Sequence, residues 1–289
     1  MARRSIPLAG RVVAITGAAR GIGRATAQAC VRAGMRVAIG DVDLAAAEAT
    51  AAQIGSGTIA VQLDVRERAS VAHFLDEVEA RLGPLDVLVN NAGIMPLKPL
   101  VDEDDATAHR QVDINVHGVL HGMKEALPRM IARDRGLIVN IASVAGRLGF
   151  SGGATYSGTK HFVVGVSEAA RAELRGSGVQ IICVMPAVVR TELASGLAQG
   201  TYIKHVEPED VAAAIVSALR SPRFEVYVPR MVTPLVKLGA ALPQPIREGF
   251  CRFLRIDRSL ADPDDAVRRA YELRAAAEIE QALQRGHEV

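Results

Sequence analysis

The chain has 289 residues, of which 49% are hydrophobic, which suffices for one sizeable core and excludes a disordered or fibrous protein. Its 34 Lys and Arg residues nearly balance its 32 Asp and Glu residues, and the net charge of +2 gives no electrostatic footprint for nucleic acid. No apolar run approaches the ~20 residues of a membrane span, and no signal peptide is recognisable, so we expect a cytoplasmic protein.

Short apolar runs alternate along the chain with longer Ala-rich segments of helical spacing. The predicted strands are residues 11–16, 36–40, 58–63, 85–90, 136–142, 179–185 and 225–228. The predicted helices are residues 22–34, 44–54, 68–82, 103–133, 154–176 and 208–219. Most of the strands are continuously apolar, which is typical of strands covered on both faces. The alternation predicts an α/β fold with a doubly wound, parallel, seven-stranded sheet, whose ligands bind beyond the carboxyl ends of the strands.

Glycines follow the first predicted strand in the segment Thr16-Gly-Ala-Ala-Arg-Gly-Ile-Gly23. Gly17 permits a tight turn, Gly21 lets the backbone approach a pyrophosphate, and Gly23 lets the helix pack closely on the strand. The helix that begins at Ile22 then offers unpaired N–H groups to the phosphates. Any loop that needs positive φ angles would use glycines, but a strand before it and a helix after it favour a dinucleotide site.

The charges near this loop bear on the choice of nucleotide. Asp41 closes the second predicted strand, where a carboxylate binds the adenosine ribose hydroxyls and repels a 2′-phosphate. Arg20, in the glycine loop, would instead attract that phosphate. We expect NAD because Asp41 holds the position that touches the ribose, and NADP stays open because of Arg20.

Three further motifs accompany the glycine loop: Asn90-Asn-Ala-Gly93, Ser143 just beyond the fifth strand, and Tyr156-Ser-Gly-Thr-Lys160. With them, residues 8–230 resemble the short-chain dehydrogenase/reductase (SDR) family of NAD(P)-dependent oxidoreductases. The resemblance implies a Rossmann fold, a homodimer or homotetramer, and a tetrad whose catalytic residues are Asn115, Ser143, Tyr156 and Lys160.

The resemblance also extends the set of residues expected to bind the cofactor. Asp64, with Val65 beside it, would hold the adenine amino group, and Val188 and Thr191 would bind the carboxamide. Ala187 stands where the family has Gly, which restricts the backbone there. The full predicted set is Gly17, Arg20, Gly21, Ile22, Gly23, Asp41, Asp64, Val65, Asn91, Ala92, Gly93, Tyr156, Lys160, Pro186, Val188 and Thr191.

Tyr156 and Lys160 lie one helical turn apart on one face of a predicted helix. A free phenol, with a pKa of about 10, is a poor base at neutral pH, and we expect the Lys160 ammonium to lower that pKa. Ser143 would hold the substrate oxygen near Tyr156, and Asn115 would bind a water that relays protons. Each residue alone fits a structural role, but together they indicate hydride transfer between a nicotinamide and a secondary alcohol or ketone.

Apolar residues surround the expected reaction site. The predicted substrate-binding residues are Ser143, Tyr156, Met95 after the fourth strand, Phe150 after the fifth and Val189 after the sixth. Because no Arg or Lys is positioned there to hold a carboxylate, we expect a small hydrophobic substrate of lipid, steroid or acyl type. Two alternatives stay open: a nucleotide-binding regulatory protein, and isomerase or lyase chemistry on the same fold.

Residues 231–289 are predicted to form a helical extension beyond the dinucleotide-binding and catalytic domain of residues 1–230. An apolar stripe recurs there at helical spacing: Leu235, Leu238, Leu242, Ile246, Phe250 and Phe253. Basic residues lie among them, so residues 231–258 either contact a membrane surface or lid a lipid cleft, or pack on the domain or a second copy. The last helix, after Asp265, is predicted to face solvent or a partner.

Histidines and cysteines give no sign of a metal site. His117, His121 and Glu125 lie four residues apart along one helix, and we interpret them as surface or interface residues. Cys30, Cys183 and Cys251 are widely spaced among apolar neighbours, which predicts buried free thiols in a reducing compartment.

Overall fold

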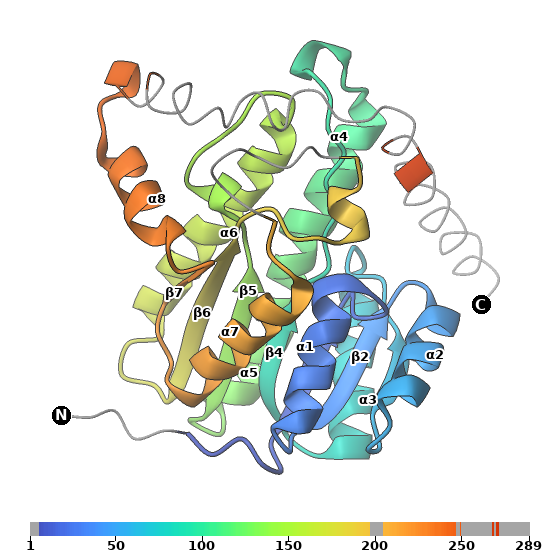
Figure 1. The fold of residues 1–289 in the computed structure, drawn as a ribbon. Helices are drawn as coiled ribbons and strands as arrows, with labels where there is room; N and C mark the ends of the chain where they lie inside the picture. The colour runs from blue at the N-terminus through green and yellow to red at the C-terminus, as the bar shows by residue number, and fades with distance from the viewer. Residues whose placement is uncertain (1–5, 197–204, 247–248, 250–267, 269, 272–289) are drawn as a thin grey trace.

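The structure is a computed structural model, and it describes residues 6–196, 205–246, 249, 268 and 270–271. One parallel sheet runs through these residues in the order β3-β2-β1-β4-β5-β6-β7 (Figure 1). Its strands are β1 (Val12–Thr16), β2 (Arg36–Asp41), β3 (Ile59–Gln62), β4 (Leu85–Asn90), β5 (Gly136–Ile141), β6 (Val179–Pro186) and β7 (Glu225–Val228). The predicted doubly wound sheet is therefore confirmed, and its winding reverses between β1 and β4, where such sheets bind ligands.

Helices cover both faces of the sheet (Figure 1). They are α1 (Gly21–Arg32), α2 (Leu44–Ile54), α3 (Arg68–Leu82), α4 (Asp105–Val112), α5 (Gly118–Ile131), α6 (Ala154–Glu173), α7 (Pro208–Arg220) and α8 (Val232–Ala241). One buried apolar cluster joins α1, α2 and α7 to the sheet, and a second joins α3, α5 and α6 to it. Apart from the edge strand β3, which is only partly buried, the strands are buried on both faces, as their continuous apolar runs predict.

The helix predicted over residues 103–133 is interrupted. A π-helical turn, η2 (Asp113–His117), separates α4 from α5, and Ile114 and Asn115 are buried within it. A π turn inserts an extra residue into the helical repeat, and such turns recur at functional sites. The spacing of hydrophobic residues alone does not reveal this turn. A regular α-helix and an α-helix with a single π turn have nearly the same hydrophobic pattern.

Beyond β7 the chain forms α8, which packs on the domain through Val232, Val236 and Gly239. Of the predicted apolar stripe, Leu235 and Leu242 are half-buried, whereas Leu238 is 54% exposed and Ile246, beyond the helix, is 58% exposed. The stripe therefore packs only in part on the described part of the domain. Phe250 and Phe253 lie outside the described residues.

Cys30 and Cys183 are free and buried, as predicted, and Cys251 lies outside the described residues. Burial raises the pKa of each of the two thiols to about 12, which leaves them unreactive at neutral pH. No helix in the described parts of the chain combines the length and the apolar character that crossing a membrane requires.

Candidate active site

The glycine loop after β1 depends on its missing side chains. Gly17 has φ +62°, and a Cβ there would lie 2.7 Å from the Ala92 Cα. A Cβ on Gly23 would lie 2.5 Å from the carbonyl oxygen of Gly17, so only glycine lets α1 approach the loop. Gly21 has φ +56°, and the Thr191 Cγ2 lies 3.4 Å from its ideal Cβ position. The loop therefore presents bare backbone at the start of α1, where Ile22 lies, and it fits a pyrophosphate.

Hydrogen bonds from the residues after β4 hold this loop in position. The Thr16 Oγ1 accepts hydrogen bonds from the backbone N–H groups of Asn91 and Ala92, both at 3.0 Å. The Asn91 Nδ2 donates to the carbonyl oxygens of Thr16 at 2.9 Å and Gly17 at 2.8 Å. These bonds join the two strands that flank the reversal of the sheet, so the predicted nucleotide residues of both strands lie together.

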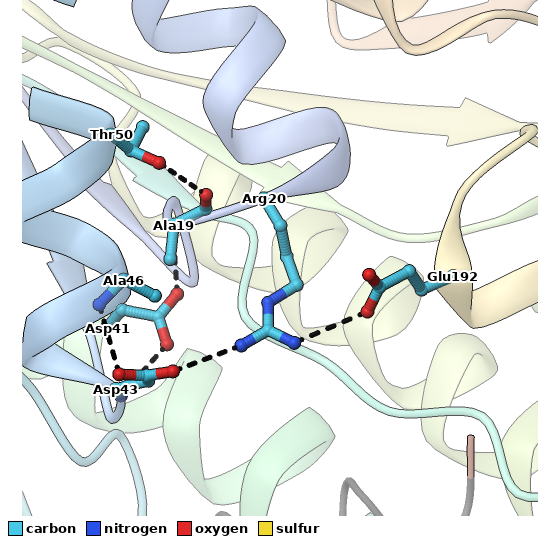
Figure 2. A network of polar contacts seen from close by, with 7 residues as sticks. All are labelled: Ala19, Arg20, Asp41, Asp43, Ala46, Thr50 and Glu192. Atoms are coloured by element: carbon cyan, nitrogen blue, oxygen red, sulfur yellow. Dashed lines mark hydrogen bonds and ion pairs between the residues drawn. The ribbon is translucent and has the colours of Figure 1, made fainter. Parts of the chain in front are cut away.

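Asp41, at the end of β2, faces the glycine loop (Figure 2). Its carboxylate accepts hydrogen bonds from the backbone N–H groups of Ala19 at 2.9 Å and Asp43 at 3.2 Å. Burial raises the pKa of Asp41; these two bonds and the charge of Arg20 lower it, but burial outweighs them. The carboxylate that is predicted to bind the ribose is thus held beside the glycine loop by two backbone N–H groups.

Arg20 lies between two carboxylates (Figure 2). Its guanidinium contacts Asp43, the N-cap of α2, at 3.4 Å, and Glu192, in η4 (Glu192–Ala194), at 3.3 Å. Since both ion pairs are partly exposed, each is weak by itself. The positive charge of Arg20, which was expected to attract a 2′-phosphate, therefore already has two negative neighbours.

Asp64 and Val65 follow β3. Both carboxylate oxygens of Asp64 contact the Arg66 side chain, with a closest N–O distance of 2.5 Å. The carboxylate predicted to hold the adenine amino group therefore already has Arg66 as a partner. Val65 packs against α5, since a Cβ on Gly118 would lie 2.8 Å from the Val65 Cγ2.

Asn115 is fully buried in the π turn, and its amide bonds to the loop after β4. Its Oδ1 accepts from the Ile94 N–H at 2.9 Å, and its Nδ2 donates to the Ile94 carbonyl at 2.9 Å and to the Thr159 Oγ1 at 3.1 Å. A Cβ on Gly93 would lie 3.1 Å from the Asn115 Oδ1 and 3.6 Å from the Lys160 Nζ. Gly93 thus brings these two predicted catalytic residues together, while the side chain of Asn115 acts mainly as a tether for the loop.

Tyr156, Ser143 and Lys160 meet at the carboxyl end of β5. Tyr156 and Lys160 are buried in α6, and the Lys160 Nζ lies 5.7 Å from the Tyr156 ring centroid and donates to the Ile141 carbonyl at 2.9 Å. Burial raises the pKa of Tyr156 to about 12, against the lowering effect of a hydrogen bond with Ser143. Burial lowers the pKa of Lys160 to about 8. The expected lowering of the Tyr156 pKa below that of a free phenol is therefore not found in the protein alone, because burial dominates.

An apolar cluster surrounds Tyr156. Its other members come from the segments after β4, β5 and β6: Met95, Leu97, Ala145, Phe150, Val188, Leu193 and Ala194. The Phe150 and Tyr156 rings lie 6.3 Å apart between centroids. The predicted substrate residues Met95 and Phe150 thus lie beside the phenol that is predicted to be catalytic.

Val189 lies elsewhere. It packs in the cluster beneath α7 and forms an isolated parallel bridge with Val206. Its neighbour Val188 belongs to the apolar cluster around Tyr156, and the Val188 carbonyl accepts from the Val206 N–H at 2.9 Å. Since successive extended residues point to opposite sides, only one of the two valines faces the substrate loops.

The segment after β6 keeps an ordinary backbone despite its alanine. Pro186 ends β6, and the Ala187 N–H donates to the Val228 carbonyl at 2.8 Å, which continues the pairing with β7. Ala187 is not among the described non-glycine residues with positive φ. The Ala for Gly exchange therefore causes no strain at this position, and Thr191 still reaches Gly21.

Two residues near the site were missed by the sequence reasoning. Arg268 is 3% exposed and Tyr271 is 8% exposed, although this part of the chain was predicted to face solvent or a partner. The Tyr271 hydroxyl accepts from the Met95 N–H at 3.4 Å, and Arg268 donates to the Leu193 carbonyl at 2.8 Å. An arginine therefore lies beside the predicted substrate loops, where its Nη1 is bonded to backbone carbonyls. No motif marks these residues, and only three-dimensional proximity reveals them.

The histidines of η2 and α5 have protein neighbours. His117 contacts Asp113 at 3.1 Å, and His121 contacts the Val65 carbonyl at 3.0 Å. Glu125 pairs with Arg68 at 2.7 Å. Among the residues that the structure places, no three His, Cys, Asp or Glu side chains group as metal ligands.

Comparisons with known proteins agree with this geometry. The family model described as short chain dehydrogenase matches residues 11–201. The chain is 42% identical over 191 residues to a sorbitol dehydrogenase of Cereibacter sphaeroides, covering 66% of this chain and 75% of that protein. It is 37% identical to a cis-4-hydroxycyclohexanecarboxylate dehydrogenase of Sinomonas cyclohexanicum, covering 71% of this chain and 87% of that protein.

A solved structure of an SDR protein from Burkholderia phymatum, in complex with NAD, superposes with a TM-score of 0.75 at 29% identity. The match covers 81% of this chain and 94% of that chain. The shared region includes the sheet and thus the framework of the predicted nucleotide site.

Proposed function

The chain belongs to the short-chain dehydrogenase/reductase family and is an NAD(P)-dependent oxidoreductase that acts on CH–OH groups. From this premise we propose that it interconverts a hydrophobic secondary alcohol and its ketone with NAD. The observation that carries this proposal is the position of the Tyr156 phenol, which shares a hydrogen bond with Ser143 inside an apolar cluster. A hydroxyl-bearing carbon would meet its acid–base group there with apolar side chains around it.

The preference for NAD is supported by charge. A 2′-phosphate on the ribose would meet the carboxylates of Asp41 and Asp43, and Arg20 contacts both Asp43 and Glu192. Uncompensated negative charges close to a phosphate oppose its binding. The ribose hydroxyls of NAD, in contrast, can donate hydrogen bonds to Asp41.

Side chains of this protein would transfer the proton of the substrate hydroxyl. Bound NAD supplies the acceptor for the hydride that leaves the alcohol carbon. Ser143 donates to the substrate oxygen and holds it beside Tyr156, which takes the hydroxyl proton in oxidation and returns it in reduction. Lys160, one turn away, supplies positive charge near the phenolate whenever it is protonated.

The raised pKa of Tyr156 sets the pH dependence. With a pKa of about 12, Tyr156 keeps its proton at neutral pH and is ready to donate it to a ketone. Alcohol oxidation needs the phenolate, so we expect its rate to rise with pH up to the pKa of Tyr156 in the ternary complex, while ketone reduction does not require alkali.

The proposal is tested by measuring kcat/KM for a panel of secondary alcohols with NAD and with NADP. The panel runs from cyclohexanol and long-chain alcohols to sorbitol. We expect the highest kcat/KM with an apolar alcohol and NAD. Tyr156→Phe should lower kcat by about 10²- to 10⁴-fold and leave NAD binding nearly unchanged. Tyr227→Phe is the matched control, because the Tyr227 hydroxyl contacts Glu225 at 3.4 Å rather than the catalytic residues. Full activity of Tyr156→Phe would overturn the mechanism, and a polyol as the best substrate would overturn the substrate class.

A further inference from the structure

A second pocket lies at the edge of the sheet, between β7, α6 and the start of α8. Figure 1 shows α8 beside β7, the last strand of the sheet. The pocket has a volume of about 530 Å³, which is the size of a small-molecule site. It shares no residue with the apolar cluster around Tyr156, and its wall at Glu168 lies twelve residues, or about 18 Å of helix, further along α6. The pocket is therefore separate from the candidate active site.

Basic side chains predominate in this pocket, which we call the basic pocket. Four basic residues and two acidic residues line it: Arg147, Arg223, Arg230, Lys237, Glu168 and Glu225. The Glu225 Oε1 accepts from the Arg147 Nη2 at 2.9 Å, and its Oε2 accepts from the Lys237 Nζ at 2.8 Å. The Tyr227 hydroxyl also donates to Glu225, at 3.4 Å. Glu225 thus compensates Arg147 and Lys237, and it is not the partner of the other two arginines.

Arg223 and Arg230 line the same pocket without such a partner. Within the described part of the chain, neither side chain forms an ion pair or a hydrogen bond. Burial lowers the pKa of Arg223, and the charge of Arg230 lowers it further. The remaining carboxylate, Glu168, is exposed and forms no ion pair with any described residue. Two like charges that share a pocket favour the binding of an anion between them.

We propose that the basic pocket binds a small phosphorylated ligand, whose phosphate contacts Arg223 and Arg230. A phosphate monoester carries a charge of about −1.5 to −2 at neutral pH, which matches the excess of two positive charges in the pocket. The planar guanidinium group can donate two parallel hydrogen bonds to a phosphate. Thr233 brings the first turn of α8 into the wall, where the helix dipole also favours an anion. Because the pocket is larger than a phosphate, an organic group can lie against the rings of Phe224 and Tyr227.

Isothermal titration of the full chain with inorganic phosphate and with phenyl phosphate tests this proposal. Constant ionic strength removes general screening effects, and saturating NAD keeps the anions away from the glycine loop. We expect one site for both probes and tighter binding of phenyl phosphate, because its ring contacts the aromatic wall. Arg223→Gln and Arg230→Gln should each weaken the binding of both probes by about 10- to 100-fold, as expected for the loss of a charge-assisted contact. Arg223→Lys keeps the charge but not the planar group, so its affinity should lie between those of Arg223→Gln and the wild type.

Arg32→Gln is the matched control, because Arg32 is exposed at the end of α1, on the other face of the sheet. It should bind both probes as the wild type does. Since Arg223 and Arg230 have no partner among the described residues, both Gln variants should keep the wild-type melting temperature. These measurements need no turnover, so their result does not depend on the proposed function.

Two outcomes would overturn the proposal. One is that the wild type binds neither probe. The other is that both Gln variants bind phosphate as tightly as the wild type does. Sedimentation velocity of the same variants then shows whether the basic pocket instead belongs to a contact between protein chains, since the oligomeric state would change while phosphate affinity does not.

Discussion

The proposed coenzyme side and the proposed substrate side of the site are built in different ways. On the proposed coenzyme side, the glycine loop, Asn91 and Asp41 lie at the ends of three neighbouring strands and are joined by hydrogen bonds between side chains and backbone. On the substrate side, Met95, Tyr156, Leu193 and Tyr271 come from separate parts of the chain and meet mostly through apolar side chains. The first side is therefore fixed by the sheet, and the second depends on how loops and the C-terminal residues pack on it.

Among the substitutions that test this comparison, one at Gly23 is expected to have the largest effect. In Gly23→Ala, the new methyl group must displace the Gly17 carbonyl or the backbone at Ala18, because its Cβ would lie within 2.7 Å of both. We expect a loss of about 1–3 kcal/mol in the free energy of unfolding and a rise in the NAD Kd of 100-fold or more. Thermal denaturation and calorimetric titration with NAD measure the two effects.

Gly165→Ala in α6 is the matched control, because a Cβ there meets nothing within 4 Å. It should leave NAD binding unchanged and stabilise the helix slightly. Equal NAD affinity in Gly23→Ala and the wild type would contradict the view that the bare backbone of this loop makes the coenzyme side.

A smaller effect is expected at Asp41. Asp41→Ala removes a carboxylate that a ribose hydroxyl would meet, so we expect kcat/KM with NAD to fall about 10- to 100-fold, the size of one charged hydrogen bond. The ratio of NAD to NADP activity should fall with it. Asp43→Asn, which keeps the cap on α2 but removes its charge, should change NAD activity much less. An unchanged coenzyme ratio in Asp41→Ala would mean that Asp41 does not select the nucleotide.

The smallest effect concerns the attachment of α8, on the C-terminal side. Burial raises the pKa of Glu225, but Lys237, at 2.8 Å, and Arg147 outweigh it, so the net pKa is lowered. A lowered carboxyl pKa stabilises the fold above the unfolded value of about 4.3, and this contribution is lost as the pH falls through the folded value.

Lys237→Met should therefore lower the melting temperature by a few degrees at most at neutral pH, since the pair is partly screened by solvent. The difference from the wild type should shrink below pH ~4, where Glu225 becomes protonated. Lys124→Met, on the exposed surface of α5, provides the control. A deficit that persists at low pH would show that the aliphatic part of Lys237 matters, not its charge.

The sequence predicts the coenzyme side in more detail than the substrate side, for a physical reason. Strand positions and the roles of Gly17 and Gly23 follow from local backbone requirements, which leave a pattern in a few consecutive residues. The π turn around Asn115 and the outward orientation of Leu238 depend on packing between elements. Arg268 gives no local signal at all, because its partners Leu193 and Ser195 lie more than 70 residues earlier.

The short turn η4 has an arginine bound at each of two neighbouring residues: Arg20 of the glycine loop contacts the Glu192 side chain, and Arg268 holds the Leu193 carbonyl. A shift of Arg20 on dinucleotide binding would act on Glu192, which is next to the residue that Arg268 holds and to the apolar cluster around Tyr156. Coenzyme and alcohol should then influence each other's affinity reciprocally, by equal factors, as linkage requires. In kinetic experiments, this coupling through η4 predicts ordered binding in which the nucleotide binds first.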